Sequence, residues 1–164
     1  MERQKVLDEL AKPISRELLD SHIPARFAFT GTDGFPRVVP VAFLWTGSEI
    51  VTCTTTNAKK NPALRQHPKV ALTIDTEGYP PRVLLIRGTA RTEVVDGVPE
   101  EYVEASRKIV PVAEMEQWEG GVRMLYPQMV KITITPEWAR LQDFQTTLPQ
   151  NVEEILRSLP APAK

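Results

Sequence analysis

The residues best suited to chemistry lie in segment 52–62, where threonine hydroxyls are followed by Lys59 and Lys60. Asn61 followed by Pro62 predicts a helix start, because asparagine caps free amide groups and proline tolerates the first helical position. Lysines just before a helix face the positive end of its dipole, and a bound anion would offset that repulsion. Hydroxyl, ammonium and amide groups could therefore converge on one phosphate. A solvated, screened loop is the alternative, and the segment alone leaves both open.

A second segment, 34–43, could face a flat ligand. Its alternation predicts a strand over 36–46 with one apolar face, entered through a turn at Asp33 and Gly34. Pro40 has no amide hydrogen, so pairing there is expected to be one-sided or irregular. Backbone groups would then remain free to meet the edge of a planar ring. An edge strand with a bulge is the alternative reading of the same pattern.

The sequence lacks the usual catalytic patterns. Its two histidines, His22 and His67, form no metal-ligand spacing with each other or with Cys53, so no metal site is expected. There is no nucleophile elbow, phosphate-binding P-loop or dinucleotide glycine fingerprint. Cys53 lies within a threonine-rich strand and is interpreted as a small packing residue, although a Cys-His pair remains open. No catalytic residue is assigned, and a cofactor is expected to carry any reaction.

Composition narrows the class of protein. A chain of 164 residues predicts one domain, with a core large enough to need no disulfide or metal. The net charge of −1 argues against a nucleic-acid or acidic-membrane partner. A single cysteine, no signal-like N-terminus and no membrane-length apolar run predict a cytoplasmic protein.

Hydrophobic periodicity predicts a mainly β fold with peripheral helices. Three early strands joined by short turns suggest an antiparallel meander, and six or seven such strands suggest a closed barrel. Residues 1–20 are expected to form a helix interrupted near Pro13, residues 23–142 the barrel core, and residues 160–164 a frayed tail. The predicted strands are 25–30, 36–46, 49–55, 69–75, 82–93, 129–135 and 138–143; the other predicted helices are 61–67, 99–109, 113–126 and 152–159.

Together these segments resemble the pyridoxamine 5'-phosphate oxidase-like family, the FMN-binding split barrels. The matching motifs, in chain order, are Asp33-Gly34-Phe35-Pro36, Pro40-Val41-Ala42-Phe43, Thr54, Lys60-Asn61, Leu64-Arg65, Pro68-Lys69-Val70, Gly88-Thr89-Ala90 and Ile132-Thr133-Ile134-Thr135-Pro136-Glu137. They span roughly residues 23–142, and their order and spacing are more specific than any one of them.

The resemblance implies a homodimer with two cofactor sites at the subunit interface and an unidentified small-molecule substrate. It places Arg37, Val38, Val39, Pro40, Val41 and Ala42 along the ring and ribityl chain, with Cys53 and Thr54 beside that chain. It assigns the phosphate to Lys59 and Lys60, next to Asn61, and brings Arg82 and Val83 near the cofactor. Arg123, Tyr126 and Trp138 are candidates for the contribution of the partner subunit.

The resemblance also orders the candidate functions. The chain ends without the Arg- and Trp-bearing segment of the true oxidases, so it is closer to shorter relatives, some of which use the deazaflavin coenzyme F-420. Arg65 and Lys69 are the candidates for holding that coenzyme's acidic tail, but Ala58 stands where some deazaflavin-binding relatives carry arginine. We therefore expect an FMN-binding oxidoreductase. A deazaflavin-dependent reductase and a non-catalytic flavin or haem binder are the alternatives.

Overall fold

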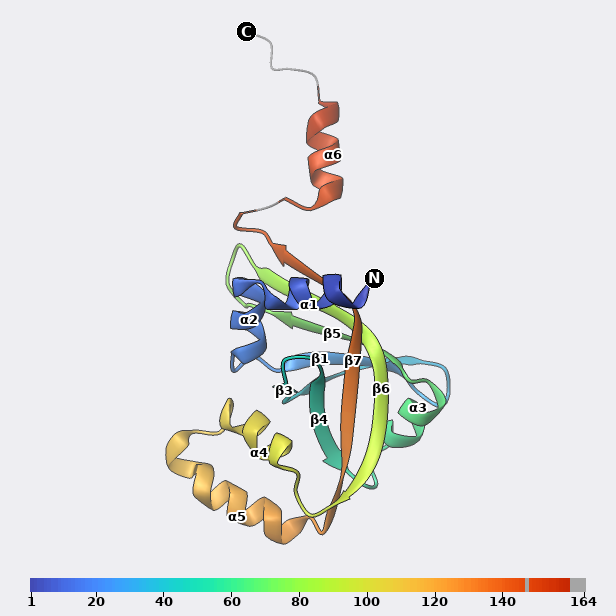
Figure 1. The fold of residues 1–164 in the computed structure, drawn as a ribbon, viewed down its shortest axis with the longest axis vertical. Helices are drawn as coiled ribbons and strands as arrows, with labels where there is room; N and C mark the ends of the chain where they lie inside the picture. The colour runs from blue at the N-terminus through green and yellow to red at the C-terminus, as the bar shows by residue number, and fades with distance from the viewer. Residues whose placement is uncertain (147, 160–164) are drawn as a thin grey trace.

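The computed structural model describes residues 1–146 and 148–159 and consists of one sheet with helices around it (Figure 1). The strands are β1 (Ala25–Thr30), β2 (Pro36–Val41), β3 (Leu44–Trp45), β4 (Ile50–Thr55), β5 (Lys69–Asp75), β6 (Arg82–Asp96) and β7 (Gln128–Asp143). The helices are α1 (Arg3–Ala11), α2 (Pro13–Asp20), α3 (Lys60–Gln66), α4 (Glu100–Arg107), α5 (Met115–Leu125) and α6 (Gln150–Ser158), with a 3-10 turn at Val112–Glu114.

The seven strands form one antiparallel sheet in the order β2-β1-β5-β6-β7-β4-β3. The first and last strands of this order follow one another in the chain, so the sheet curls round until β2 meets β3. The backbone of Ala42 and Phe43 then joins the two ends covalently. At this point the barrel is closed by continuous backbone and not by a strand pair. The fold is the expected mainly β split barrel with peripheral helices.

The break between β2 and β3, here called the split, corrects two predictions. The strand predicted over 36–46 is two strands that pair with different partners, because β2 pairs with β1 while β3 pairs with β4. Both hairpin pairings of the predicted three-stranded meander form, but they lie at opposite ends of the sheet order, so the meander is interrupted between β2 and β3. The Thr52 hydroxyl donates a hydrogen bond of 2.8 Å to the Ala42 carbonyl, which holds β4 against the break.

Strand β7 is continuous where two separate strands, 129–135 and 138–143, were predicted. A bulge interrupts its register with β6, so that Arg87 faces Trp138 but Gly88 faces Pro136, leaving Glu137 as the extra residue. Proline cannot donate to a ladder, and a bulge accommodates that missing donor without ending the strand. Pro136 therefore reshapes the strand and does not end it.

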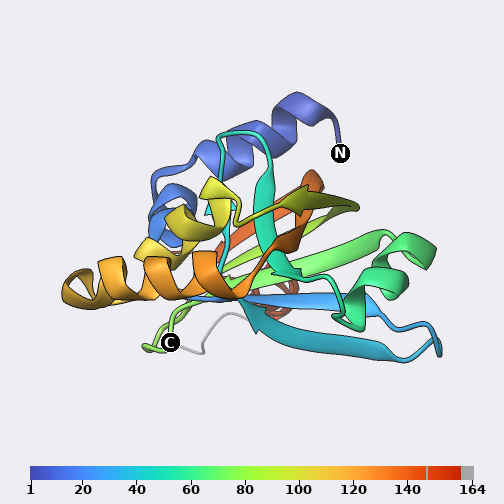
Figure 2. The same ribbon diagram turned by 90° about the horizontal axis from the view of Figure 1, so that it is seen from below.

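Two hydrophobic clusters stabilise the molecule. The larger fills the barrel with strand residues such as Phe27, Ile50 and Ile86, and α1 and α2 add Leu10 and Leu18. The smaller lies between the α4–α5 pair and the β4–β7 strands, around Val103, Met115 and Met129. Seen from below, α4 and α5 lie on one side of the barrel and α3 on the other, beside the β1–β2 turn (Figure 2).

The first and last described helices both lie towards the end of the sheet where β7 ends (Figure 1). Helix α1 crosses β7, and α6 extends away from the barrel beyond the end of β7 (Figure 1). The opening helix predicted over 1–20 with an interruption near Pro13 is confirmed as α1 and α2. The predicted frayed tail, 160–164, lies outside the described residues.

Candidate functional site

The split leaves two strand edges free. Strand β2 pairs only with β1, which confirms the one-sided pairing predicted from Pro40. Strand β4 pairs with β3 only at Ile50 and Val51, so its Thr52–Thr55 portion has β7 on one side and no strand on the other. The residues predicted to line a cofactor, 37–42 and 53–54, therefore flank this opening. Their unpaired backbone groups can hydrogen-bond to a ligand.

Side chains of β2 alternate between the two faces of the sheet. Val39 and Val41 turn inward to the barrel core, whereas Val38 and Pro40 turn outward. Arg37 lies on the inward side at the mouth of the barrel, where its guanidinium pairs with Asp33 at 2.7 Å. The side chains of residues 37–42 therefore cannot all face one ring. What these six residues share is a backbone that borders the opening.

The two lysines of the predicted phosphate site lie at the start of α3. Lys60 is half-buried, and neither it nor Lys59 has an acidic partner among residues 1–146 and 148–159. Burial lowers the pKa of Lys60, because a desolvated ammonium group without a counter-ion is disfavoured. A bound anion would supply the missing counter-charge, so the residues present fit a phosphate.

Asn61 has a different role from the one predicted. Helix α3 begins at Lys60 with Lys59 as its N-cap, so the prediction that Asn61 caps the helix is wrong. Asn61 lies in the first turn, only 2 % exposed. Its side-chain amide donates to the carbonyls of Thr55 and Thr56 at 2.9 and 3.0 Å. The residue thus fastens the preceding loop to the helix and positions the two lysines.

Thr54 and Cys53 lie on opposite faces of β4. Thr54 shares a face with Ile50 and Thr52, which belong to the barrel side of the split. Cys53 packs instead against the smaller cluster, near Tyr102 and Trp118. Burial, with Glu101 nearby, raises the pKa of the Cys53 thiol to about 12. Its environment is that of a packed, unreactive thiol.

Arg82 and Val83, the last two predicted cofactor residues, also lie in different surroundings. Arg82 forms a two-pronged ion pair with Glu17 of α2, at 2.7 and 2.8 Å, and this partner raises its pKa. Val83 points to the outer face of the sheet, into a groove of about 380 Å³ that also contains Val38 and Ala28. The structure therefore brings Val83 together with Val38, and commits Arg82 to the contact between α2 and the barrel.

The candidates for a partner-subunit contribution lie in two places, Arg123 and Tyr126 at the end of α5 and Trp138 on β7. The Arg123 guanidinium bonds to Glu100 and Glu119 within its own chain. Tyr126 packs against the smaller cluster. Trp138, on β7, lines a groove of about 540 Å³ that shares Ala28 and Ala71 with the Val38–Val83 groove.

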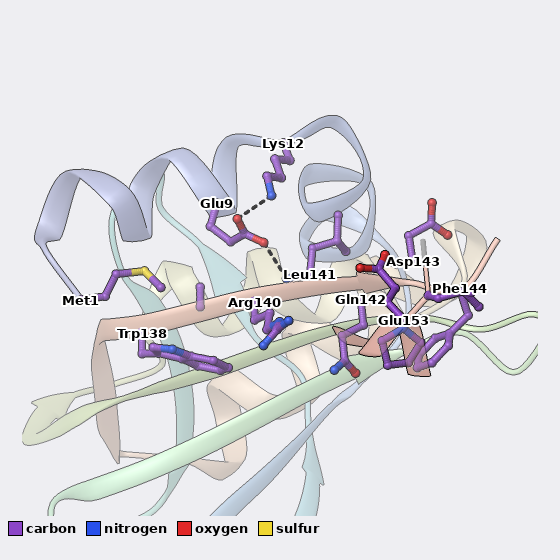
Figure 3. A pocket seen from close by; sticks show the side chains of 13 residues that line it. Met1, Glu9, Lys12, Trp138, Arg140, Leu141, Gln142, Asp143, Phe144 and Glu153 are labelled. Atoms are coloured by element: carbon purple, nitrogen blue, oxygen red, sulfur yellow. Dashed lines mark hydrogen bonds and ion pairs between the residues drawn. The ribbon is translucent and has the colours of Figure 1, made fainter. Parts of the chain in front are cut away.

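A cavity of about 600 Å³ contains none of the predicted cofactor residues. It lies between α1, the second half of β7 and the start of α6 (Figure 3). A Glu9 carboxylate accepts the Leu141 amide at 2.7 Å and pairs with Lys12, which ties α1 to the strand. Trp138, Arg140 and Gln142 point to the opposite side of β7 from Leu141. No motif in the sequence indicated this cavity, because it forms only when α1 docks on β7.

The described residues contain neither a metal-binding cluster nor a membrane-spanning helix. Within residues 1–146 and 148–159, no three histidine, cysteine, aspartate or glutamate side chains gather in a way that could hold a metal ion. Over the same part of the chain, no helix has the length and apolar character needed to cross a membrane.

Comparison with solved structures supports the fold. A structure named F420 reductase is 21% identical with a TM-score of 0.57, covering 76% of this chain and 94% of its own. A conserved hypothetical protein from Mycobacterium tuberculosis is 20% identical with a TM-score of 0.57, covering 92% and 90%. The heme storage protein HutZ from Vibrio cholerae is 18% identical with a TM-score of 0.55, covering 80% and 92%.

Sequence comparison adds the family. None of the curated protein sequences matches this chain significantly. The family model described as pyridoxamine 5'-phosphate oxidase matches residues 12–143, which include the whole barrel and the start of α3. The protein therefore belongs to the pyridoxamine 5'-phosphate oxidase family.

Proposed function

We propose that the protein is an FMN-binding oxidoreductase that works as a homodimer. The observation that carries this proposal is Lys60, a half-buried cation at the start of α3 with no acidic partner among the described residues. It lies beyond the free edge of β4, so a phosphate bound there would leave the rest of the ligand beside the split. Family membership supplies the ligand class.

Each part of the opening has a distinct task in this proposal. Lys59 and Lys60 hold the phosphate, and Asn61 keeps their loop in place through its bonds to Thr55 and Thr56. The Thr54 hydroxyl and the free backbone of β2 meet the ribityl chain and the ring. A bound flavin supplies hydride transfer at its ring, and the protein supplies position and exclusion of water.

The charges near α3 favour FMN over the deazaflavin coenzyme. The acidic tail of the latter requires free cations leading away from the phosphate, for which Arg65 and Lys69 were the candidates. The Lys69 ammonium instead bonds to both carboxylate oxygens of Glu137, at 2.9 and 3.1 Å, and to Thr89. Only Arg65 of that pair has no acidic partner within the described ranges.

Lys60→Ala is expected to weaken FMN binding by roughly 10- to 150-fold, the usual value of about 1.5–3 kcal/mol for a hydrogen bond to a charged group. Quenching of flavin fluorescence during titration of the apo protein measures the dissociation constant. Lys5→Ala is the matched control, because Lys5 is an exposed lysine already paired with Glu2. Equal affinities for the two variants would show that the Lys59–Lys60 loop holds no phosphate.

Parallel titrations decide between the cofactors. Tighter binding of the deazaflavin coenzyme, weakening steeply with salt, would replace FMN in the proposal. A haem absorption band after reconstitution, without flavin binding, would instead support a haem carrier. Bleaching of the bound flavin by a nicotinamide donor, followed by substrate-dependent recovery, is the outcome expected of an oxidoreductase.

A homodimer is supported by an uncovered sheet face. Val38, Ala28 and Ala71 follow one another across β2, β1 and β5 on the outward side. Val83 and Leu85 lie on the same outward side of β6, opposite Asp75 and Thr73, and neither hydrophobic cluster includes any of the five apolar residues. Apolar side chains left uncovered on a sheet face, here among polar residues such as Arg26 and Asp75, are typical of an interaction surface.

Sedimentation at micromolar concentration is expected to give twice the chain mass of 18.4 kDa. Val38→Lys should shift the protein towards monomer, because a charge would be buried in the proposed interface. Val94→Lys is the control, since Val94 on β6 is 59% exposed and Val38 is 63% exposed. A wild-type monomer that still binds cofactor would contradict this assembly.

A further inference from the structure

Arg87 and Arg140 stand beside each other without a counter-ion. Register places Arg87 opposite Trp138 and Leu85 opposite Arg140, so the two arginines are diagonal neighbours on the outer face of β6 and β7. Diagonal positions in a sheet lie within reach of long side chains. Neither guanidinium has a hydrogen bond or acidic partner among residues 1–146 and 148–159.

Trp138 holds one of the two cations in place. The Arg87 guanidinium lies over the Trp138 ring, 4.2 Å from its centre. Stacking on an aromatic ring orients the planar group and leaves its N–H donors at the edge free to meet a ligand. Trp138 also borders both neighbouring cavities, of about 540 and 600 Å³, and Arg140 lines the larger (Figure 3).

The carboxylates around these cavities are already engaged. Glu137 bonds to Lys69 and Thr89, and Glu9 to Lys12 and the Leu141 amide. Glu153 pairs with Arg157, and Asp143 accepts hydrogen bonds from residues of the following turn. Within residues 1–146 and 148–159, no acid is left to neutralise the two neighbouring cations, which therefore repel one another. This is the arrangement that binds an external anion.

We propose that Arg87, Trp138 and Arg140 form a binding site for the oxyanion group, phosphate or carboxylate, of a small molecule. Paired guanidinium groups suit both groups, because each presents two oxygens to a planar fork of donors. Ligand atoms beyond the oxyanion extend into the cavity beside α1. The site consists of residues of one chain and does not depend on cofactor binding at Lys60. It borders the proposed dimer face, because Arg87 lies opposite Ala71 and Arg140 opposite Leu85.

Titration of the purified full chain with inorganic phosphate and, separately, citrate tests the site. Sodium chloride keeps ionic strength constant, and the Trp138 indole N–H resonance, assigned with Trp138→Phe, reports occupancy. We expect saturable shifts with at least one of the two anions, and the tighter of the two identifies the oxyanion class. Arg87→Gln and Arg140→Gln are each expected to weaken binding at least tenfold.

Arg91→Gln is the matched control. Arg91 is an exposed arginine on the same strand as Arg87, has no acidic partner among the described residues, and lies in neither cavity. Its variant should bind within about twofold of the wild type if local geometry decides affinity. Equal weakening of anion binding in all three arginine variants would show that net charge, and not the proposed site, governs the affinity. Shifts that fail to saturate with either anion would also overturn the proposal.

Discussion

Gly88→Ala is expected to lower the free energy of unfolding by about 3 kcal/mol, the upper part of the usual range for overpacking. A Cβ at this position would lie 2.3 Å from the carbonyl oxygen of Thr135 and 3.0 Å from its carbon. Both atoms belong to backbone within the central β6–β7 pair, so no flexible side chain can move aside. Urea denaturation followed by circular dichroism measures the change.

Gly120→Ala provides the matched control with the opposite sign. Gly120 lies inside α5, and a Cβ there would contact nothing within 4 Å. Alanine should therefore raise stability by up to about 1 kcal/mol, its advantage over glycine in a helix. Loss of less than about 1 kcal/mol in Gly88→Ala would mean that the bulge beside Pro136 can open to admit a methyl group.

Asn61→Asp is expected to destabilise the protein by about 3 kcal/mol or more, since it buries an unpaired charge. The substitution replaces an amide donor by a carboxylate oxygen facing the Thr55 and Thr56 carbonyls, which now accept at 2.9 and 3.0 Å. The loop before α3 would open, and FMN affinity should fall with it. Urea denaturation and flavin titration follow the two effects.

Asn57→Asp separates this effect from a simple added charge in the same loop. Asn57 is exposed, and its side-chain oxygen accepts a hydrogen bond from the Thr55 hydroxyl, which a carboxylate can also do. Stability should therefore change by less than about 1 kcal/mol. Similar losses in both variants would show that charge near Lys59 and Lys60, and not the Asn61 hydrogen bonds, governs the loop.

Strand positions followed directly from local periodicity. The predicted strands 25–30 and 69–75 coincide with β1 and β5, because their side chains alternate between a buried and a solvent-facing side. The strand predicted over 82–93 continues to Asp96, where alternation weakens as both faces become exposed. Elements of this kind are determined by neighbours along the chain, so a single sequence is enough to place them.

The candidate site was only partly predictable. The spacing of Lys59, Lys60 and Asn61 predicted the lysine loop and the nearby helix start. The same pattern could not show that the Asn61 amide bonds back to residues five and six positions earlier. Nor could it show that Arg82 is committed to Glu17, since that ion pair joins elements 65 residues apart.

Local sequence patterns were enough to predict the element types, the order of motifs and the presence of a lysine-rich loop before a short helix. The position of the split depends on tertiary structure, because the alternation of apolar residues over 36–46 does not indicate that its two halves pair with different strands. Tertiary structure also decided which charges lack partners. Arg87 and Arg140 become neighbours only through the β6–β7 register, and Lys69 loses its freedom only when Glu137 is displaced by the bulge. Pairing between distant strands sets these contacts. The hydrophobic pattern of a strand determines which side chains face the core, but it does not name the residues of a distant strand that lie opposite them.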